Sequence, residues 1–211
     1  MTVNCHDQQL VLDPYCGVHW VEQNTLIVSD LHLGKSAHFR KYGLPLPGAV
    51  GDNNMWNLSI LLDRYRPQRV LFLGDLFHSE HNHEWEQFLD LLGNYQQCQW
   101  LLVKGNHDVL DTHLYESGVL QVVNTLQDGP FYFAHDPEEL DKEQGYGMAG
   151  HIHPCVRLMG KANQSLRLKC FWFNDDFALL PAFGTFTGSH RIKPKRTDRV
   201  YVITDTSVRK V

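Results

Sequence analysis

The sequence predicts an α/β protein in which two packed β-sheets are flanked by helices. In the first half, short apolar runs alternate with amphipathic helical patterns, which is typical of a largely parallel sheet with right-handed crossovers. Beyond residue 154, apolar runs follow one another with turns between them, which favours antiparallel pairing there. No repeat or Gly/Ser-rich linker divides the 211 residues. We therefore expect one domain, residues 1–211.

The first half contains the elements expected of the parallel sheet. Two apolar runs within residues 9–28, with a turn at Asp13-Pro14, predict an antiparallel pair. The second run ends in Leu26-Ile27-Val28, which reads as a buried strand. Apolar residues at helical spacing predict helices over 48–65 and 83–95. Residues 70–74 and 100–105 are the buried strands that these helices connect.

The second half contains more strands than helices. We expect strands at residues 131–134, 146–150, 166–173, 177–183 and 200–204. A short acidic helix is expected from Pro137 to Glu143. The aromatic run Phe171-Trp172-Phe173 could offer a stacking surface for bases, but alternating sheet core is the favoured interpretation.

Composition restricts the classes of function. The chain is 43% hydrophobic and 20% charged, with a net charge of −5 and a pI near 6.2. The field of the whole molecule would not attract nucleic acid, so a polyanionic substrate must be held locally. The five cysteines are scattered without C-x-x-C spacing, which argues against a disulfide framework or zinc ribbon. With no apolar run approaching 18 residues and no secretory leader, we expect a cytoplasmic protein.

Ligand-capable residues follow five of the apolar runs. The carboxyl ends of strands in open α/β sheets are where ligands bind. Residues two apart in an extended chain point to the same side, so Asp30 and His32 are expected to reach one point. Seven donors are more than one first-row metal usually needs, and they fit two metals that share a bridging carboxylate. We assign Asp75 as this bridge. The donors are Asp30, His32, Asp75, Asn106, His135, His151 and His153.

The blocks D-x-H, G-D, G-N-H-D, H and G-H-x-H, in this order, resemble the calcineurin-like metallophosphoesterases over residues 26–154. The resemblance implies their four-layer α/β/β/α fold. It also implies that His107 faces the scissile phosphate and that Asp108 orients it. One implied metal site consists of Asp30, His32, Asp75 and His153, and the other of Asp75, Asn106, His135 and His151.

One position departs from the family pattern. Many members have G-D-x-x-D at the second block, whereas this chain has His78 where the last Asp would lie. Asp75 is present, so the departure does not affect the expected bridging of the two metals. It affects only what the side chain at position 78 contacts. The loop after Lys35, which contains Arg40 and Lys41, is either a solvated surface loop or a substrate-approach loop. We take Arg40 and His78 as candidate substrate-binding residues.

Longer matches extend the resemblance. The segments SDLHLGK-x-x-HFR-x-x-GLPLP, GDLFHS, KGNHD and PAFGTFTG are similar to the bacterial ligase-associated DNA damage response endonucleases, often called PdeM. This similarity spans nearly the whole chain. It implies a nuclease for DNA phosphodiesters with a functional link to a DNA ligase and a helicase. Composition and spacing indicate a phosphoester-type site and do not indicate DNA.

The resemblance also implies a chemistry. Two divalent ions roughly 3.5–4 Å apart make hydroxide available near neutral pH, and this bridging hydroxide attacks phosphorus. His107, as imidazolium, assists the leaving group. Mn²⁺ is favoured, with Fe, Zn²⁺ and Mg²⁺ as alternatives. Two other functions stay open: a phosphomonoesterase or nucleotide phosphatase with the same metals, and a non-catalytic scaffold, which lost ligands would mark. All seven donors and His107 are present.

Two groups of basic residues have no assigned role. The second group, near the C-terminus, is either a solvated loop between strands or a patch that contacts the backbone of a nucleic acid. The stretch from Gly184 to Gly188 is either a phosphate-approaching loop or a plain turn. The first basic group is Arg64, Arg66 and Arg69, and the second is Arg191, Lys193, Lys195, Arg196 and Arg199. The sequence does not decide the oligomeric state.

Overall fold

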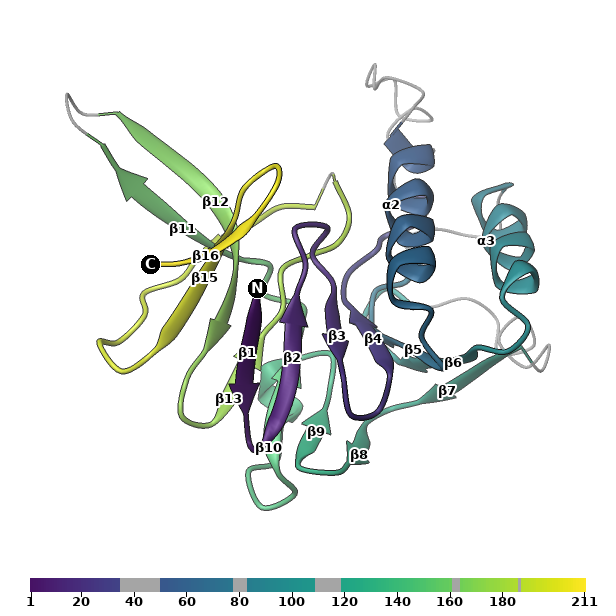
Figure 1. The fold of residues 1–211 in the computed structure, drawn as a ribbon, viewed down its shortest axis with the longest axis horizontal. Coiled ribbons are helices and arrows are strands. Elements are labelled where there is room, and N and C mark those ends of the chain that lie inside the picture. The colour runs from purple at the N-terminus through teal and green to yellow at the C-terminus, as the bar shows by residue number, and fades with distance from the viewer. Residues whose placement is uncertain (35–49, 78–82, 109–118, 161–163, 186) are drawn as a thin grey trace.

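A computed structural model gives the arrangement of the chain (Figure 1). It describes residues 1–34, 50–77, 83–108, 119–160, 164–185 and 187–211. Two β-sheets lie against each other, and within the described residues two α-helices cover the outer side of the first sheet.

The first sheet has seven strands in the order β1 to β7. The pairs from β1 to β4 are antiparallel, and those from β4 to β7 are parallel. The antiparallel entry and parallel centre are as predicted, whereas β1 and β7 were not expected. The strands are β1 (Thr2–Cys5), β2 (Gln8–Leu12), β3 (Val18–Trp20), β4 (Thr25–Val28), β5 (Arg69–Leu73), β6 (Gln99–Val103) and β7 (Leu120–Val123).

Both predicted helices are present: α2 (Val50–Tyr65) and α3 (His83–Asn94). They pack on one face of the first sheet in a single apolar cluster. Leu61 from α2 and Phe88 from α3 meet Val28 and Phe72 from the central strands in this cluster. Central strands that are buried on both faces explain the continuous apolar runs in the sequence.

The second sheet combines parallel and antiparallel pairs. β12 pairs antiparallel with β11, β13 and β15, as expected. β10 lies outside the segment that was expected to be antiparallel, and it runs parallel to both β9 and β13. The twelve residues between β9 and β10 are enough for a crossover that returns the chain to the end of the sheet where β9 begins. β10 therefore runs in the same direction as β9. The strands are β8 (Leu126–Asp128), β9 (Phe131–Phe133), β10 (Tyr146–Ala149), β11 (Pro154–Met159), β12 (Ser165–Phe173), β13 (Phe177–Leu179), β14 (His190–Arg191), β15 (Arg199–Ile203) and β16 (Val208–Lys210).

The acidic helix in this crossover is shorter than predicted. Only the 3₁₀-helix η1, Pro137–Glu139, forms, and the Asp136 carboxylate accepts a hydrogen bond from the N–H of Glu138 at its start. Within the described residues after β7, η1 is the one helical segment. The helix layer and the two sheets of the predicted α/β/β/α fold are therefore present, and η1 packs against β10 of the second sheet.

The two sheets share one apolar core. Trp20 of β3 lies edge-on to Phe131 of β9, with ring centroids 4.9 Å apart. Phe171 and Phe173 of β12 belong to the same buried cluster. The interpretation of the aromatic run as alternating sheet core is thus confirmed.

All five cysteines are free thiols, as the sequence predicts. Burial raises the pKa of Cys170 to about 12. Among the described helices, none has the length and apolar character needed to cross a membrane.

A buried carboxylate joins the end of α2 to the turn between β2 and β3. Asp13 is 2% exposed and accepts hydrogen bonds from Arg64 Nη1 at 2.5 Å and Tyr65 Oη at 2.7 Å. It also accepts one from the backbone N–H of Tyr15. The predicted turn at Asp13-Pro14 is thereby tied to the helix.

We expect Asp13→Ala to lower the free energy of unfolding by about 1–3 kcal/mol, because Arg64, Tyr65 and the N–H of Tyr15 lose their shared, buried acceptor. Urea unfolding followed by circular dichroism measures this change. Asp176→Ala is the matched control, since Asp176 pairs with Lys142 on the surface and such pairs contribute about 0–1 kcal/mol. Equal losses in the two variants would contradict the assignment.

Candidate metal centre

The predicted donors lie in loops at the carboxyl ends of β4, β5, β6, β9 and β10. Hydrogen bonds link these loops: the N–H of Asp30 donates to the carbonyl of Gly74, and that of His32 donates to the carbonyl of Asp75. The N–H of Gly150 donates to the carbonyl of His135 between two loops of the second sheet, and the N–H of His151 donates to Asp30 Oδ2, in a loop of the first sheet, at 3.1 Å. The loops from both sheets therefore meet at one rim of the sandwich.

The ligand-bearing backbone is not extended. Asp30 and His32 have φ values of +56° and +48°, and Asp75 has +50°. The extended-chain argument for Asp30 and His32 is therefore wrong, because β4 ends at Val28 and both residues adopt the left-handed conformation. His151 and His153 share it, with φ of +62° and +52°. Asp and His are among the residue types that tolerate this conformation best.

Asp30, His32 and His153 form the first donor group, with ligand atoms all within 4.8 Å of one another. His153 Nε2 lies 3.1 Å from Asp30 Oδ1. The other ring nitrogen, Nδ1, lies 3.0 Å from the carbonyl oxygen of Gly188. Because a carbonyl only accepts, Nδ1 carries the proton, and Nε2 of neutral His153 presents a lone pair to the site.

Asp75, His135 and His151 form the second group within the same distance limit. His135 Nδ1 lies 2.9 Å from the carbonyl oxygen of Leu73, so its Nε2 faces the site by the same argument. His151 Nδ1 is 3.2 Å from His135 Nε2. His151 Nε2 in turn lies 3.6 Å from Asp136 Oδ2, an acidic neighbour not identified from the sequence.

Asp75, a member of the second group, also approaches the first group. Its Oδ1 is 3.4 Å from His135 Nε2, and its Oδ2 is 3.7 Å from His32 Nε2. One carboxylate thus reaches histidines of both groups, with a different oxygen for each. This is the geometry expected of a carboxylate that bridges two cations.

The electrostatics of Asp75 and His135 are coupled. Burial alone raises the pKa of Asp75, but the hydrogen bond and charge of His135, the N–H of His107 and the charge of His32 hold it below its ordinary value. Burial lowers the pKa of His135, and its carboxylate neighbours Asp75 and Asp30 more than offset this, raising it to about 9. The carboxylates therefore favour a positive charge at this position, which a proton or a divalent cation can supply.

The residues present fit a pair of divalent cations. Asp30 Oδ1 and His153 Nε2 are buried and have no hydrogen-bond partner among the described residues. Leaving such atoms unsatisfied costs free energy, and a cation between them would satisfy both. Mixed carboxylate and imidazole donors suit first-row divalent metals such as Mn²⁺, Fe²⁺ and Zn²⁺.

His107 is at the open side of this cluster. Its side chain is exposed, and its ring lies 5.7 Å from that of His32, in an edge-to-face arrangement. Its backbone N–H donates to Asp75 Oδ1 at 2.9 Å, which fixes the turn that carries it. The neighbouring Asn106 is also exposed. Both residues thus follow β6 at the same rim as the donor groups.

Asp108 is fully buried and connects loops. Its Oδ1 accepts from the N–H groups of Leu76 and Phe77, and its Oδ2 accepts from that of Gly105. Burial raises the pKa of Asp108 to about 6 even with these three donors. These contacts hold the loop after β5 against the loop after β6. The predicted orientation of the His107 ring by Asp108 stays a prediction.

Two glycines allow the close approach of these loops. Gly74 has φ of +72°, and a Cβ there would collide with the ring of His135. A Cβ on Gly150 would collide with the Ser29 hydroxyl, which donates to Asp30 Oδ2 at 2.5 Å. Both positions therefore require glycine so that the histidine and carboxylate can lie where they do.

Asn54 is a supporting residue that the sequence analysis missed. It is buried in α2, and its Nδ2 donates to the carbonyl of Leu31, between Asp30 and His32. Its Oδ1 accepts from the N–H and hydroxyl of Thr185. The signal in the sequence that could have identified Asn54 is its position, as a polar residue, on the apolar side of the predicted helix.

We expect Asn54→Ala to weaken metal binding about tenfold, because Leu31 and Thr185 lose the side chain that fixes the Asp30 loop. Isothermal titration of the EDTA-stripped protein with Mn²⁺ measures this change. Ser59→Ala is the matched control, since Ser59 lies on the same helix and donates only to the carbonyl of Trp56 among the contacts described. Unchanged affinity in a folded Asn54→Ala variant would contradict this supporting role.

Three further groups of residues were singled out from the sequence: the candidate substrate-binding residues, the first basic group and the stretch from Gly184 to Gly188. Arg40 and His78 lie outside the described residues. Arg64 and Arg69 form ion pairs with Asp13 and Asp128, which accounts for them structurally. In the stretch after Gly184, the N–H of Gly184 donates to the carbonyl of Asp30, so this stretch contacts the metal-centre loop.

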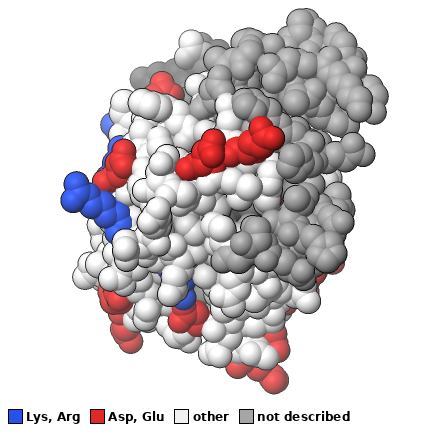
Figure 2. All heavy atoms as spheres, turned by 90° about the vertical axis from the view of Figure 1, so that its right-hand side faces the viewer, with Lys and Arg blue, Asp and Glu red and all other residues white. Residues whose placement is uncertain are grey.

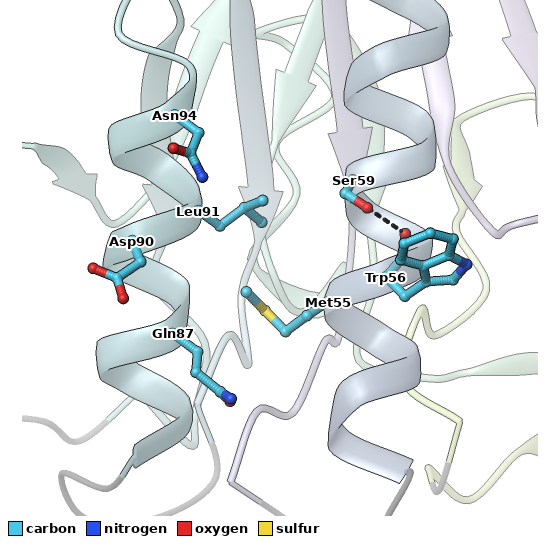
Figure 3. A pocket seen from close by; sticks show the side chains of 7 residues that line it. All are labelled: Met55, Trp56, Ser59, Gln87, Asp90, Leu91 and Asn94. Carbon is cyan, nitrogen blue, oxygen red and sulfur yellow. Dashed lines mark hydrogen bonds between the residues drawn. The ribbon is translucent and has the colours of Figure 1, made fainter.

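A groove between α2 and α3 is a separate feature. Met55 of α2 and Leu91 of α3 point into the space between the helices, whereas the Trp56 ring lies on the side of α2 away from α3 (Figure 3). Trp56 is 66% exposed. None of these lining residues is a predicted metal ligand.

The model of the calcineurin-like phosphoesterase family matches residues 24–198. The chain belongs to this family. The family resemblance and fold predicted from the sequence are thereby confirmed, and the chain is a phosphoesterase-type hydrolase with two candidate metal-binding Asp/His groups. None of the curated proteins matches the chain at a significant level.

Solved structures include one with high similarity over its full length. The nuclease MPE from Pseudomonas putida aligns with a TM-score of 0.81 and 26% identity, covering 100% of this chain and 99% of that chain. The phosphoesterase Yfce from E. coli gives 0.43 and 14%, covering 89% and 97%. A conserved uncharacterised protein from Streptococcus pneumoniae TIGR4, described as a predicted phosphoesterase, gives 0.35 and 15%, covering 87% and 84%.

Proposed function

We propose that this chain is a dimetal-dependent phosphodiesterase that cleaves DNA as an endonuclease. The observation that carries the proposal is the position of Asp75, whose two oxygens each approach a histidine of a different donor group. The similarity to a protein named as a nuclease supports nucleic acid as the substrate class. The seven predicted donors would hold the ions, with Mn²⁺ as the favoured metal.

The protein groups have separate tasks in this mechanism. When bound, the two ions supply an activated water and neutralise charge on the phosphoryl oxygens. His107, exposed beside His32, can donate a proton to the departing alkoxide. Asp108 holds the loops after β5 and β6 together, which fixes His107 relative to Asp75. Gly188 and Leu73 orient the imidazoles of His153 and His135 through their carbonyls.

The proposal also covers the domain organisation, the cellular location and the functional partners of the enzyme. Residues 1–211 act as one domain, which the apolar core shared by the two sheets supports. A cytoplasmic location is supported by five free cysteines. A role in DNA repair, with a functional link to a DNA ligase and a helicase, rests on the resemblance of the longer sequence segments.

The test is a comparison of substrates. EDTA-stripped protein is reloaded with Mn²⁺ and incubated with bis-p-nitrophenyl phosphate, p-nitrophenyl phosphate, and circular single-stranded and duplex DNA. We expect hydrolysis of the diester and nicking or linearisation of DNA, both abolished by EDTA. Cleavage of the monoester alone would overturn the proposal in favour of a phosphomonoesterase or nucleotide phosphatase. Inactivity on every substrate with metal bound would favour a scaffold.

A further inference from the structure

A β-hairpin of β11 and β12 extends from the metal centre beyond the two packed sheets (Figure 1). Pro154, the first residue of β11, directly follows the predicted ligand His153. β14 adds to the other edge of β11 in parallel. The three strands therefore form a small sheet whose base is at the site.

Strand register places four basic residues on one face of this small sheet. Arg157 lies directly opposite Arg167, and Cys155 lies between Lys169 and Arg191. Because side chains alternate between faces, Arg157, Arg167, Lys169 and Arg191 share a face, which we call the cationic face. The opposite face is apolar, with Val156, Cys170 and Ile192 in one buried cluster.

The cationic face continues the inner face of the second sheet. Phe171 and Phe173 have the same parity as Lys169 and Arg167 along β12, and both phenylalanines are buried between the sheets. Where β12 leaves the sandwich, the positions that pointed into the core become basic. This change from apolar to basic residues is what a strand needs if its exposed half contacts an anion.

Two of the basic residues are anchored to the loop beside the metal centre. Lys169 Nζ donates to the carbonyls of Ala182 and Gly184, at 2.6 and 2.8 Å. Arg167 donates to the carbonyl of Ser189. The same loop contacts Asp30 through the N–H of Gly184 and His153 through the carbonyl of Gly188. The cationic face is therefore connected to the site by direct hydrogen bonds.

The positive charge on this face is not neutralised within the described part of the chain. Lys169 and Arg167 bond to carbonyls, and among the described residues Arg157 and Arg191 are exposed and form no ion pair. Like charges directly opposite each other on a sheet are destabilising. Residues 154–173 contain no Asp or Glu, although the chain has 24 acidic residues against 19 basic ones. An anion bound on this face would offset the repulsion between Arg157 and Arg167.

The face that carries α3 shows the opposite character. Acidic side chains are scattered over its described atoms, and basic ones are few (Figure 2). Asp63 and Asp90 are exposed on α2 and α3. A polyanion approaching the metal centre is therefore favoured along the hairpin and not over the helices.

We propose that the cationic face binds the sugar–phosphate backbone of a nucleic acid strand whose scissile phosphate lies at the metal centre. The inference rests on the proposed function and adds the route of the substrate. Arg157 is three residues beyond Pro154, roughly 10 Å along the strand, so it contacts a phosphate outside the one that is cleaved. A substrate with a single phosphodiester does not reach it.

The test is the double variant Arg157→Gln/Arg191→Gln, with Arg66→Gln/Lys142→Gln as the control that removes the same charge from exposed positions elsewhere. Binding of fluorescent single-stranded and duplex DNA is measured in EDTA at several salt concentrations. We expect about tenfold weaker binding in the double variant. We also expect the slope of log affinity against log salt to become about two units shallower, one for each phosphate that the variant no longer neutralises. The control should bind as the unaltered protein does.

A second measurement separates this inference from the proposed function. With Mn²⁺, the ratio of DNA cleavage to bis-p-nitrophenyl phosphate hydrolysis should fall about tenfold in the double variant. If the unaltered protein cleaves DNA and the folded double variant keeps the same cleavage ratio and the same salt slope, the inference is wrong while the proposed function is kept. An acidic protein partner then becomes the candidate occupant of the cationic face. If the unaltered protein binds DNA through the hairpin but cleaves none, the proposed function fails, and of the inference only the binding of the sugar–phosphate backbone to the cationic face stands.

Discussion

Asp75→Ala is expected to abolish binding of both metal ions and to reduce diester hydrolysis by about 10³-fold or more. A bridging carboxylate is the ligand that the two cations share, and the cations supply several kcal/mol of transition-state stabilisation. Metal content is measured by mass spectrometry after Mn²⁺ loading and desalting, and activity is measured on bis-p-nitrophenyl phosphate. The reason is local: Asp75 Oδ1 and Oδ2 approach His135 and His32 separately.

Two further variants make this result specific. Asp75→Asn keeps the side-chain size and an oxygen that can accept from the N–H of His107, so it tests charge while the hydrogen bond between the loops is kept. Asp63→Asn removes a carboxylate from the exposed surface of α2 and should leave metal content and activity as they are. Retention of two metal ions by a folded Asp75→Ala variant would contradict the bridging role.

His107→Ala is expected to keep both metals and to lose DNA cleavage by about 10²–10⁴-fold, the usual contribution of a general acid. The same variant should lose much less on bis-p-nitrophenyl phosphate, because nitrophenolate leaves without needing a proton. Measuring both substrates on the same metal-loaded preparation therefore identifies proton donation rather than a general loss of activity. The exposed position of His107, beside His32 and outside the two donor groups, is the physical reason why metal should stay bound.

The control for this variant is His6→Ala, which removes an imidazole that contacts Tyr146. It should retain cleavage of both substrates. Full DNA cleavage by His107→Ala would show that the leaving group is protonated by another residue or by water. An equal loss on both substrates would indicate that His107 acts before the leaving group departs.

The parts of the fold that were predictable are those with continuous apolar runs. β4, β5 and β6 are buried on both faces, so their sequences are apolar without alternation and their positions could be read directly. β7 is only partly buried, with a pattern of one buried and three less buried residues, and gave no comparable signal. The parallel direction of β10 depends on where the crossover after β9 returns the chain, which local sequence does not encode.

The sequence indicated which residues lie close together at the candidate site, but it did not indicate their backbone conformation. The Asp and His residues that follow apolar runs include the six that lie in two close groups, whereas Asn106 belongs to neither group. The left-handed conformation of Asp30 and His32 was not foreseen, because it depends on hydrogen bonds to Gly74 and Asp75 from another loop. Asn54 was missed for the same reason, since its partners are 23 and 131 residues away along the chain.

The left-handed conformation of five predicted ligands limits how the site can be altered. At positions 30, 32, 75, 151 and 153, the side chain that would bind metal belongs to the residue that also reverses the chain. Replacing such an Asp or His by a bulky or β-branched residue would change the donor and strain the turn together, at about 1–3 kcal/mol for each position. A substitution at these positions therefore changes the metal donor and the loop conformation together. Adapting the centre to a metal that prefers thiolate ligands would require a redesign of the loops as well.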